Sequence, residues 1–297
     1  MRMLVTGREG QIARSLAERA SGSDIEVVTL GRPELDLAGP AHDIVAAVKA
    51  ARPNVIVSAA AYTAVDRAES EPELAFAVNG QGPRAIATAA SELGVPLIHL
   101  STDYVFDGTK ASPYDEEDAT GPTGAYGASK LAGEQAVHAG HADSVVLRTA
   151  WVYSPFGANF VKTMLRLAGE RDEIGVVADQ HGNPSSALDI ADAIIAVARN
   201  LVANDDPALR GMFHCAGMGE VSWAEFAEGI FAASVDRGGP TARVRHIATA
   251  DYPTPARRPA NSRMDCSKLV SVHGVQLPDW HGSVGDVVAR LLAHQEG

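Results

Sequence analysis

The sequence contains little cysteine and no long apolar run, and each absence excludes a class of protein. Cys215 and Cys266 are the only cysteines among the 297 residues, and neither belongs to a CxxC pair or to a Cys/His spacing that binds metal. A disulfide framework and a zinc site are therefore not expected, and a reducing cytoplasm is the predicted location. No run of about eighteen apolar residues is present, so we expect no helix that spans a membrane.

Basic residues are also scarce. The chain has 25 Lys and Arg against 37 Asp and Glu, which gives a formal net charge of -12. Nucleic acids and anionic membranes are bound by clustered Lys and Arg, so neither is an expected partner. The apolar run before Gly7 is too short for a signal peptide. The hydrophobic content of 46% is that of an ordinary globular protein with a sizeable core.

Short apolar runs alternate with helix-like segments through the first half of the chain. The runs at residues 3–6, 25–30, 55–58, 97–100 and 145–149 are almost continuously apolar, as expected for strands buried on both faces of a parallel sheet. Between them, residues 11–20, 41–51, 74–93 and 126–139 have helical spacing and good helix formers. This alternation predicts an α/β fold of the Rossmann type, a doubly wound parallel sheet with helices on both faces.

After Trp151 the pattern is less regular, and the loops are rich in Gly, Pro and Asn. Helices are expected at residues 160–167, 190–202, 223–233 and 284–292. We therefore predict an NAD(P)-binding Rossmann domain over residues 1–150 and a smaller, irregular, mainly substrate-binding portion over residues 151–297. The two are expected to be partly interleaved, with the helix at 190–202 packed on the Rossmann domain.

A glycine turn follows the first expected strand. Gly7 and Gly10 lie where the chain passes from strand to helix, the context that a dinucleotide fingerprint requires. They allow the backbone to turn tightly and to approach a pyrophosphate, whose charge meets the N–H groups of the helix N-terminus. Ala13 replaces the third glycine, which normally permits close packing of helix on strand. An ordinary glycine turn gives a similar string, so the prediction of a cofactor depends on the strand and helix around it.

The second expected strand ends near Arg32, where an NAD-selective site has an acidic residue. Arg8 in the glycine turn supplies a second guanidinium, and the two suit the 2′-phosphate of NADPH. We predict NADPH as the cofactor and NADH as an alternative; two solvated arginines are the other interpretation. Asp36 and Leu37 follow, and we expect them to face the adenine.

Tyr126 and Lys130 are four residues apart on one expected helix face, and they follow Thr102 at the end of a buried strand. The Lys130 ammonium is expected to lower the pKa of the phenol from about 10 toward neutrality, because a positive charge about 4 Å away has an effect of that size. Such a phenol, beside a hydroxyl, is suited to protonate the oxygen of a ketone that receives hydride. No metal ion is expected. The same spacing also occurs by chance in ordinary helices, so its surroundings decide its meaning.

Longer segments resemble a known family. The glycine turn, Thr102, Tyr126 and Lys130 together resemble the extended branch of the short-chain dehydrogenase/reductase superfamily. Within it, six segments resemble the dTDP-4-dehydrorhamnose reductase family: residues 58–69, 101–108, 126–134, 148–153, 179–184 and 255–259. They stand in the family's order, and together they are highly specific for it.

The resemblance implies reduction of the C4 ketone of dTDP-4-dehydro-β-L-rhamnose by NADPH or NADH, giving dTDP-β-L-rhamnose for cell-surface polysaccharide. It also implies that Tyr126 donates the proton, that Lys130 binds the nicotinamide ribose and tunes Tyr126, and that Thr102 holds the substrate oxygen. The cofactor site that it implies, added to Gly7 and Arg32, is formed by Gly10, Gln11, Ile12, Asp36, Leu37, Ala61, Tyr62, Thr63, Tyr126 and Lys130. Thr102, Asp103 and Trp151 are implied to contact the dTDP-sugar.

Three more positions have two interpretations each. Asn79 resembles the asparagine that supports the active-site helix in the superfamily, with a surface asparagine as the alternative. Arg258 is expected to bind the diphosphate or else to be solvated, and Trp151 is expected to be a wall of the site or part of the core.

Some family members dimerise through magnesium held by glutamates, whereas Ser15 and Leu188 occupy such positions here. A metal-bridged dimer is therefore not expected, and we predict a monomer or a homodimer.

Two other functions stay open. A non-catalytic NADP-binding regulatory subunit is one, and it has no use for the set of Thr102, Tyr126 and Lys130. Another nucleotide-sugar reductase or an epimerase is the second. Dehydration of a nucleotide sugar usually uses an Asp-Glu pair beside the Ser/Thr, and here Asp103 is followed by Tyr104.

Overall fold

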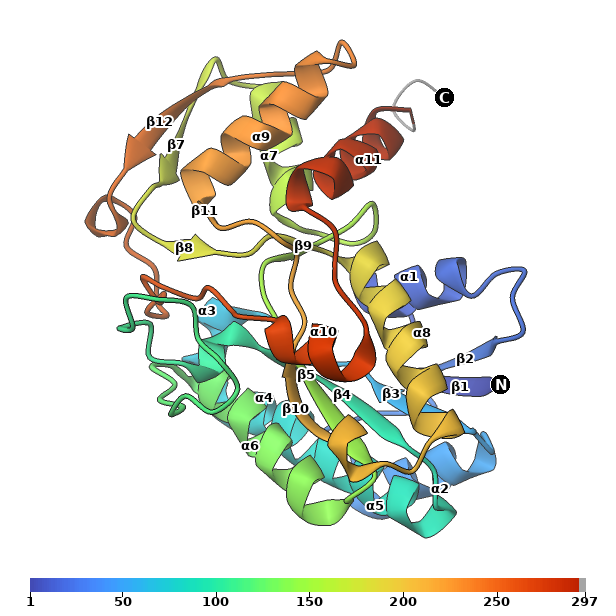
Figure 1. The fold of residues 1–297 in the computed structure, drawn as a ribbon. Helices are drawn as coiled ribbons and strands as arrows, with labels where there is room; N and C mark the ends of the chain where they lie inside the picture. The colour runs from blue at the N-terminus through green and yellow to red at the C-terminus, as the bar shows by residue number, and fades with distance from the viewer. Residues whose placement is uncertain (294–297) are drawn as a thin grey trace.

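A parallel sheet of six strands forms the centre of the molecule (Figure 1). The computed structural model describes residues 1–293. The strands lie in the order β10-β5-β4-β3-β1-β2. In chain order they are β1 (Arg2–Thr6), β2 (Glu26–Leu30), β3 (Val55–Ser58), β4 (Leu97–Thr102), β5 (Ser144–Thr149) and β10 (Gly211–His214). The doubly wound, Rossmann-type sheet predicted from the sequence is confirmed.

All five strands predicted in the first half are present. The largest difference is at β4, which continues to Thr102 instead of ending at Leu100. The sixth strand, β10, was not predicted, because it has four residues and only two consecutive apolar side chains. It pairs in parallel with β5, so that Phe213 lies opposite Leu147.

The sheet is buried on both faces. The helices over one face are α1 (Gln11–Arg19) and α8 (Ala187–Ala203), and those over the other are α2 (Ala41–Ala50), α5 (Gly82–Leu93) and α6 (Ala125–Gly140). Met3 and Val5 belong to the core beneath α1 and α8, whereas Leu4 belongs to the core beneath α2 and α5. Successive residues of a strand point to opposite faces, so a continuously apolar strand fills two cores at once.

The strand order reverses between β1 and β3. β1 has β2 on one side and β3 on the other, so the connections that leave β1 and β3 run to opposite sides of the sheet. In doubly wound sheets such a point opens a crevice at the carboxyl ends of the strands, and ligands bind there. β4 lies next to β3 and ends on the same edge at Thr102.

The single helix expected at residues 74–93 is divided. It consists of α4 (Pro72–Phe76), a π-helical turn (Ala77–Gln81) and α5. Pro83 has no N–H to donate to the carbonyl of Asn79, so regular α-helical bonding cannot pass through this point. The carbonyl of Asn79 points instead at α6, where a Cβ on Gly133 would lie 2.2 Å from it. Only glycine at position 133 allows this approach.

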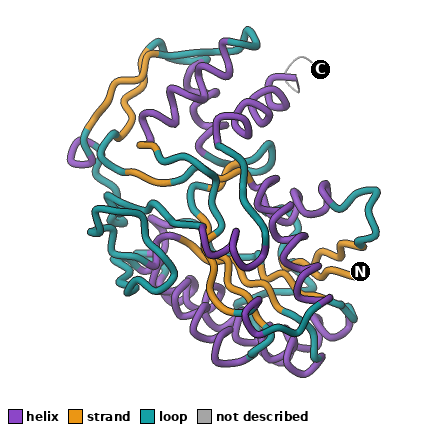
Figure 2. The backbone as a smooth tube through the Cα atoms, viewed as in Figure 1, coloured by secondary structure: helices purple, strands orange, loops and turns teal. Residues whose placement is uncertain are grey.

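The second half of the chain builds a smaller portion beyond the carboxyl edge of the sheet (Figures 1 and 2). Its helices α7 (Phe160–Ala168), α9 (Trp223–Val235) and α11 (Trp280–Ala293) share one core with β7 (Glu173–Val177) and β12 (Arg243–Ile247), which pair in parallel. The remaining elements are short: α3 (Val65–Ala68), α10 (Ser267–His273), β6 (Val152–Tyr153), β8 (His181–Gly182), β9 (Ser185–Ser186) and β11 (Val221–Ser222).

The second half also contributes to the sheet and its helical layers. β10 is an edge strand of the sheet, and α8 packs on α1 through the core that contains Ile190 and Ile194. The division at residue 150 stays a prediction, and residues 294–297 of the predicted second portion lie outside the described residues.

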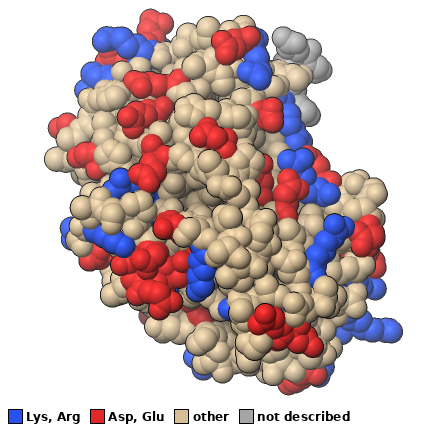
Figure 3. All heavy atoms as spheres, viewed as in Figure 1, with Lys and Arg blue, Asp and Glu red and all other residues tan. Residues whose placement is uncertain are grey.

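Charged side chains of both signs cover the surface. On the face drawn in Figure 3, Lys and Arg are interspersed with Asp and Glu and form no continuous basic area. This face therefore offers no stripe for a phosphate backbone. Over residues 1–293, none of the helices has the length and apolar character needed to cross a membrane.

Candidate active site

The turn after β1 is shaped to receive an anion. Gly7 has a φ of 95°, and a Cβ there would lie 3.5 Å from Ala60. The Thr6 hydroxyl accepts the N–H groups of Ala59 and Ala60, each at 3.0 Å, and so joins this turn to the loop after β3. Gly10 is the N-cap of α1, no side chain caps this helix, and a Cβ on Gly10 would meet nothing within 4 Å. The first N–H groups of α1 can therefore bind a pyrophosphate, and these residues fit a dinucleotide.

The two arginines predicted to bind a 2′-phosphate lie close together. Arg8 donates from Nη1 to the Arg32 carbonyl at 3.4 Å. Arg8 also pairs with Glu34 at 2.8 Å, an acidic partner that the sequence analysis did not consider. Both members of the pair are partly exposed, so their attraction is worth less than about 1 kcal/mol and a phosphate can compete for Arg8.

Gln11 connects the cofactor loop to the second half of the chain. Its Oε1 accepts from the Ser154 hydroxyl at 2.7 Å and from the Asn159 amide at 3.1 Å, and its Nε2 donates to the Val152 carbonyl at 3.3 Å. The side chain thus holds the segment after β6 against the start of α1. Ile12 is partly buried on the core beneath α1. The predicted cofactor contacts of both residues stay predictions.

Asn79 fixes the loop after β3 to α6. It accepts the Tyr62 N–H at 2.8 Å, and its amide donates to the Tyr62 carbonyl at 3.0 Å and to the Ser129 hydroxyl at 2.9 Å. Asn79 is 1% exposed, and Ser129 lies on α6 between Tyr126 and Lys130. The alternative of a surface asparagine is therefore wrong, and the expected support of the active-site helix is observed.

The positions expected beside the adenosine differ in exposure. Leu37 is buried on α5, where a Cβ on Gly82 would lie 2.8 Å from it. Asp36 is exposed, and its carboxylate accepts the Ala38 N–H at 3.0 Å. Ala61 is partly buried and Thr63 is exposed, on either side of the clamped Tyr62. The expected contacts of these residues with the cofactor stay predictions.

Tyr126, Thr102 and Asp103 lie together at the end of β4. The Thr102 hydroxyl donates to Asp103 Oδ1 at 2.9 Å and accepts the Tyr104 N–H at 3.2 Å, and it lies near enough to the Tyr126 phenol to influence its pKa. The rings of Tyr104 and Tyr126 meet edge to face with centroids 5.5 Å apart. A Cβ on Gly127 would lie 2.1 Å from the Tyr104 carbonyl, so glycine is required for this close packing of α6.

The electrostatics of Tyr126 differ from the prediction. Burial raises the pKa of Tyr126 to about 12, the Thr102 hydrogen bond opposes this rise, and the Asp103 carboxylate adds to it. Lys130 does not lower this pKa, because its amine donates to the Leu100 carbonyl at 2.5 Å. The predicted shift toward neutrality is therefore wrong. A phenol with a raised pKa is fully protonated near neutral pH, which is the form that a proton donor requires.

Lys130 is nearly fully buried, with 3% of its surface exposed. Burial lowers the pKa of Lys130 to about 8, and the Glu134 carboxylate opposes that fall. Burial and the nearby Lys130 charge also lower the pKa of His99, which contacts the Ser58 hydroxyl at 3.0 Å. Lys130 is therefore the charged partner near neutral pH, and His99 is neutral.

Asp103 is 2% exposed, which is unusual for a residue expected to bind substrate. Burial raises the pKa of Asp103 to about 6, and the Ser262 and Thr102 hydroxyls oppose the rise. Its observed role is to orient Thr102, and the predicted contact with the sugar stays a prediction.

Trp151 is held in an unusual conformation. Its φ is 47°, a left-handed value that is uncommon for a bulky residue and that clusters at functional sites. Its ring stacks on Trp223, with centroids 3.6 Å apart and an angle of 7° between the planes. A Cβ on Gly182 would lie 2.5 Å from the Trp151 ring. Both tryptophans are partly exposed, so Trp151 is not simply part of the core.

Arg258 is paired within the protein. It donates to Asp66 at 2.7 Å, and Asp66 also accepts the Ala256 N–H at 3.2 Å. The guanidinium lies 6.0 Å from the centre of the Tyr104 ring. The segment around residues 255–259 is thus attached beside the Tyr104–Tyr126 contact. Arg258 is not a solvated arginine, and its predicted binding of the diphosphate stays a prediction.

Three residues near the site were missed by the sequence analysis. Tyr104 packs on Tyr126, and Trp223 stacks on Trp151. Glu69 accepts the N–H of Ala125 at 2.8 Å and so caps α6, the helix that carries Tyr126. Glu69 belongs to the segment after α3, far from α6 in the sequence, so no local signal marked it as the cap of that helix.

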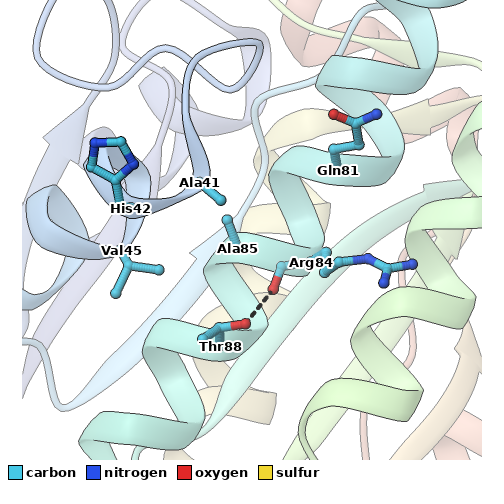
Figure 4. A pocket seen from close by; sticks show the side chains of 7 residues that line it. All are labelled: Ala41, His42, Val45, Gln81, Arg84, Ala85 and Thr88. Atoms are coloured by element: carbon cyan, nitrogen blue, oxygen red, sulfur yellow. Dashed lines mark hydrogen bonds between the residues drawn. The ribbon is translucent and has the colours of Figure 1, made fainter.

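A hollow of about 530 Å³ lies elsewhere, between α2 and α5 (Figure 4). It is lined by Ala41, His42, Val45, Gln81, Arg84, Ala85 and Thr88. None of these is a predicted site residue, so the hollow plays no part in the site. Within residues 1–293, no three His, Cys, Asp or Glu side chains are grouped so as to hold a metal ion.

A Rossmann-type sheet with an open glycine turn and a Thr–Tyr–Lys set at its carboxyl edge defines a reductase of the short-chain dehydrogenase/reductase class. The family model described as RmlD substrate binding domain matches residues 1–293. The dTDP-4-dehydrorhamnose reductase of Sinorhizobium fredii is 53% identical over 98% of each chain, and that of Escherichia coli is 41% identical over 98% of each. The chain belongs to the dTDP-4-dehydrorhamnose reductase family.

Solved structures agree with this family over the whole length. A dTDP-4-dehydrorhamnose reductase from Clostridium acetobutylicum has a TM-score of 0.91 and 34% identity, covering 98% of this chain and 100% of that one. The one from Bacillus anthracis, in complex with NADP, has a TM-score of 0.89 and 34% identity, covering 97% and 99%.

Proposed function

We propose that the chain reduces the C4 ketone of dTDP-4-dehydro-β-L-rhamnose with NADPH and so forms dTDP-β-L-rhamnose. One observation carries the proposal in a chain of this family. The Tyr126 phenol lies beside the Thr102 hydroxyl and on the same helix as the buried Lys130, at the edge of the sheet where the glycine turn opens. NADPH, when bound, supplies the hydride. The end product serves cell-surface polysaccharide.

Tyr126 supplies the proton in this proposal. Hydride addition leaves negative charge on the former carbonyl oxygen, which the phenol and the Thr102 hydroxyl stabilise by hydrogen bonds. A phenol whose pKa is about 12 is protonated at neutral pH and is still a stronger acid than the product alcohol. Tyr126 therefore completes the reduction by giving its proton to that oxygen.

Lys130 stabilises the charge that Tyr126 acquires. With its pKa near 8, the Lys130 amine is mostly charged at neutral pH, and it lies on the same helix face as Tyr126. In the observed arrangement the amine donates to the Leu100 carbonyl, so this role requires it to turn toward the phenol as the proton leaves. A buried ammonium in that position lowers the energy of the phenolate. Activity should therefore decline as the pH rises through about 8.

Cofactor choice and setting form the finer part of the proposal. Arg8 and Arg32 favour the 2′-phosphate of NADPH, and NADH is used less well. The free thiols of Cys215 and Cys266 suit a cytoplasmic location. We propose a monomer or a homodimer, and sedimentation equilibrium distinguishes them.

The test is NADPH oxidation followed at 340 nm, roughly the nicotinamide absorption maximum, with dTDP-4-dehydrorhamnose and without it. We expect oxidation that depends on the keto sugar and is slower with NADH. Binding of NADPH without oxidation contradicts the proposal and favours a regulatory subunit. Oxidation with a different keto sugar nucleotide alone favours another reductase.

A further inference from the structure

A buried ion pair lies behind the proposed active site. Arg148 donates from Nε and Nη2 to the two oxygens of Glu134, at 2.9 and 2.8 Å. The side chains are 4% and 2% exposed, and the Phe106 ring covers the guanidinium with its centre 5.0 Å away. Two parallel hydrogen bonds fix the Glu134 carboxylate in one orientation.

The pair joins α6, which carries Tyr126 and Lys130, to β5, the strand beside the one that carries Thr102. Glu134 follows Lys130 by one helical turn on the same face of α6. Arg148 lies on β5 opposite Ser101, the residue before Thr102 on β4. The ion pair therefore connects the Lys130 helix to β5, the neighbour of the strand that ends at Thr102.

Stability alone does not account for such a pair. Removing two charges from water has a large free-energy cost, and apolar residues of similar volume are often at least as stabilising. Loss of one partner, in contrast, leaves an uncompensated buried charge. A role in the chemistry of the neighbouring Lys130 explains why both charged residues are present in the core.

The charges around Lys130 show what that role is. On β4, His99 is neutral because burial lowers its pKa, and the Leu100 carbonyl accepts from the amine. On α6, Glu134 is the carboxylate that opposes the effect of burial on Lys130. Behind it stands the positive charge of Arg148 on β5.

Two titratable groups lie beyond Arg148. Burial lowers the pKa of His214 on β10 to about 4, so this imidazole is neutral. Glu116 accepts the backbone N–H of His214 at 2.7 Å, and His214 lies opposite Arg148 on the far side of β5 from β4. Glu134 is thus the negative charge placed to act on Lys130.

We propose that Glu134, held in place by Arg148, is a positioning residue that keeps the buried Lys130 amine charged while the reaction proceeds. The proposal rests on the proposed function, because it requires Lys130 to act in its charged form. Without the carboxylate, burial neutralises the amine at a lower pH, and the reductase loses activity there.

The test uses two variants: a double variant, Glu134→Leu with Arg148→Met, and the single variant Glu134→Gln. Each is compared with the native chain and with the control variant Glu92→Gln. The double variant removes both buried charges and is expected to unfold at a temperature close to that of the native chain. Glu92 belongs to an exposed pair with Lys49 and serves as the control. The measurements are kcat/KM for the keto sugar from pH 6 to 9.5 and the NADPH dissociation constant by fluorescence over the same range.

We expect the alkaline loss of activity to begin about one pH unit lower in the double variant and in Glu134→Gln. This is about a fivefold deficit at pH 8, which approaches about tenfold at higher pH and is recovered near pH 6. NADPH binding should weaken over the same interval, and Glu92→Gln should match the native chain. A folded variant with an unshifted profile, or a deficit equal at every pH, overturns the inference. If the native chain binds NADPH but does not reduce the keto sugar, the proposed function fails, and the pH dependence of NADPH binding still decides the role of Glu134.

Discussion

Tyr126→Phe removes the proposed proton donor and little else. The phenylalanine ring keeps the edge-to-face contact with Tyr104, whose ring centre is 5.5 Å away, and it keeps the packing of α6 on β4. The change deletes one hydroxyl and, at most, one hydrogen bond with the neighbouring Thr102. Such a bond contributes about 1 kcal/mol, so the folded state should persist with a melting temperature lowered by only a few degrees.

The catalytic effect should be much larger. Proton transfer by a positioned side chain accelerates a reaction by about 10² to 10⁴, which corresponds to about 3–5 kcal/mol of activation free energy. We therefore expect kcat to fall by that factor in Tyr126→Phe, while the NADPH dissociation constant changes less than about threefold. Steady-state assay of NADPH oxidation and fluorescence titration measure the two quantities.

Tyr114→Phe is the matched control. The Tyr114 hydroxyl donates to Asp107 at 2.8 Å and accepts the Lys110 backbone N–H at 3.1 Å, so this variant also loses a bonded phenol hydroxyl, outside the proposed site. It should retain native turnover. Tyr126→Phe with full activity, or equal losses in both variants, would refute the assignment of Tyr126 as the proton donor.

Three further changes have defined outcomes. Asn79→Ala removes three buried hydrogen bonds and should lower the free energy of unfolding by about 2–3 kcal/mol together with kcat, measured by urea unfolding and steady-state assay. Asp103→Asn should raise stability by about 2–3 kcal/mol at pH 7.5 and leave it unchanged near pH 4, in urea unfolding. The sign follows because burial raises the pKa of Asp103 from 3.8 to about 6, so the native chain loses stability as the pH rises between these two values and the loss is complete above 6. Arg8→Ala with Arg32→Ala should weaken NADPH binding about tenfold and spare NADH in fluorescence titration.

Each of these three predictions has an outcome that would contradict it. An Asn79 variant with native stability would show that its hydrogen bonds to the β3 loop and α6 have no net value. If the Asp103 variant is less stable than the native chain at pH 7.5 but not at pH 4, the native carboxylate is stabilised by its hydroxyl partners. Equal losses for both cofactors would remove the arginines from 2′-phosphate recognition.

Most of the sheet could be predicted because its strands are local signals. A parallel strand buried on both faces is continuously apolar, as at residues 55–58, and needs no knowledge of its partners. β10 could not be found this way, since its four residues become a strand only through pairing with β5. The π-helical turn at Ala77–Gln81 was also missed, although Gly80, Gly82 and Pro83 are all poor helix formers that mark a break.

The proposed catalytic residues could be identified from spacing, but their electrostatics could not. A shared helix face places Lys130 near Tyr126, yet it does not determine where a flexible amine points, and here it points at the Leu100 carbonyl. Burial then dominates the pKa of Tyr126. The sequence carries no local measure of that burial.

Contacts between distant segments account for the other omissions. Trp223 stacks on Trp151 from a helix more than seventy residues later, and Arg258 reaches Asp66 from the second half of the chain. Each of these side chains has an ordinary local pattern, and only the folded arrangement brings them together. The Glu134–Arg148 pair was missed for the same reason.

Isotope transfer tests the proposed reaction most directly. The chain is incubated with dTDP-4-dehydrorhamnose and NADPH that carries deuterium at the transferable position of the nicotinamide, and the sugar product is examined by mass spectrometry and NMR. We predict one deuterium at C4 of dTDP-rhamnose, formed by the native chain and hardly at all by Tyr126→Phe. A product without deuterium, or with deuterium at another carbon, would contradict direct reduction of the C4 ketone.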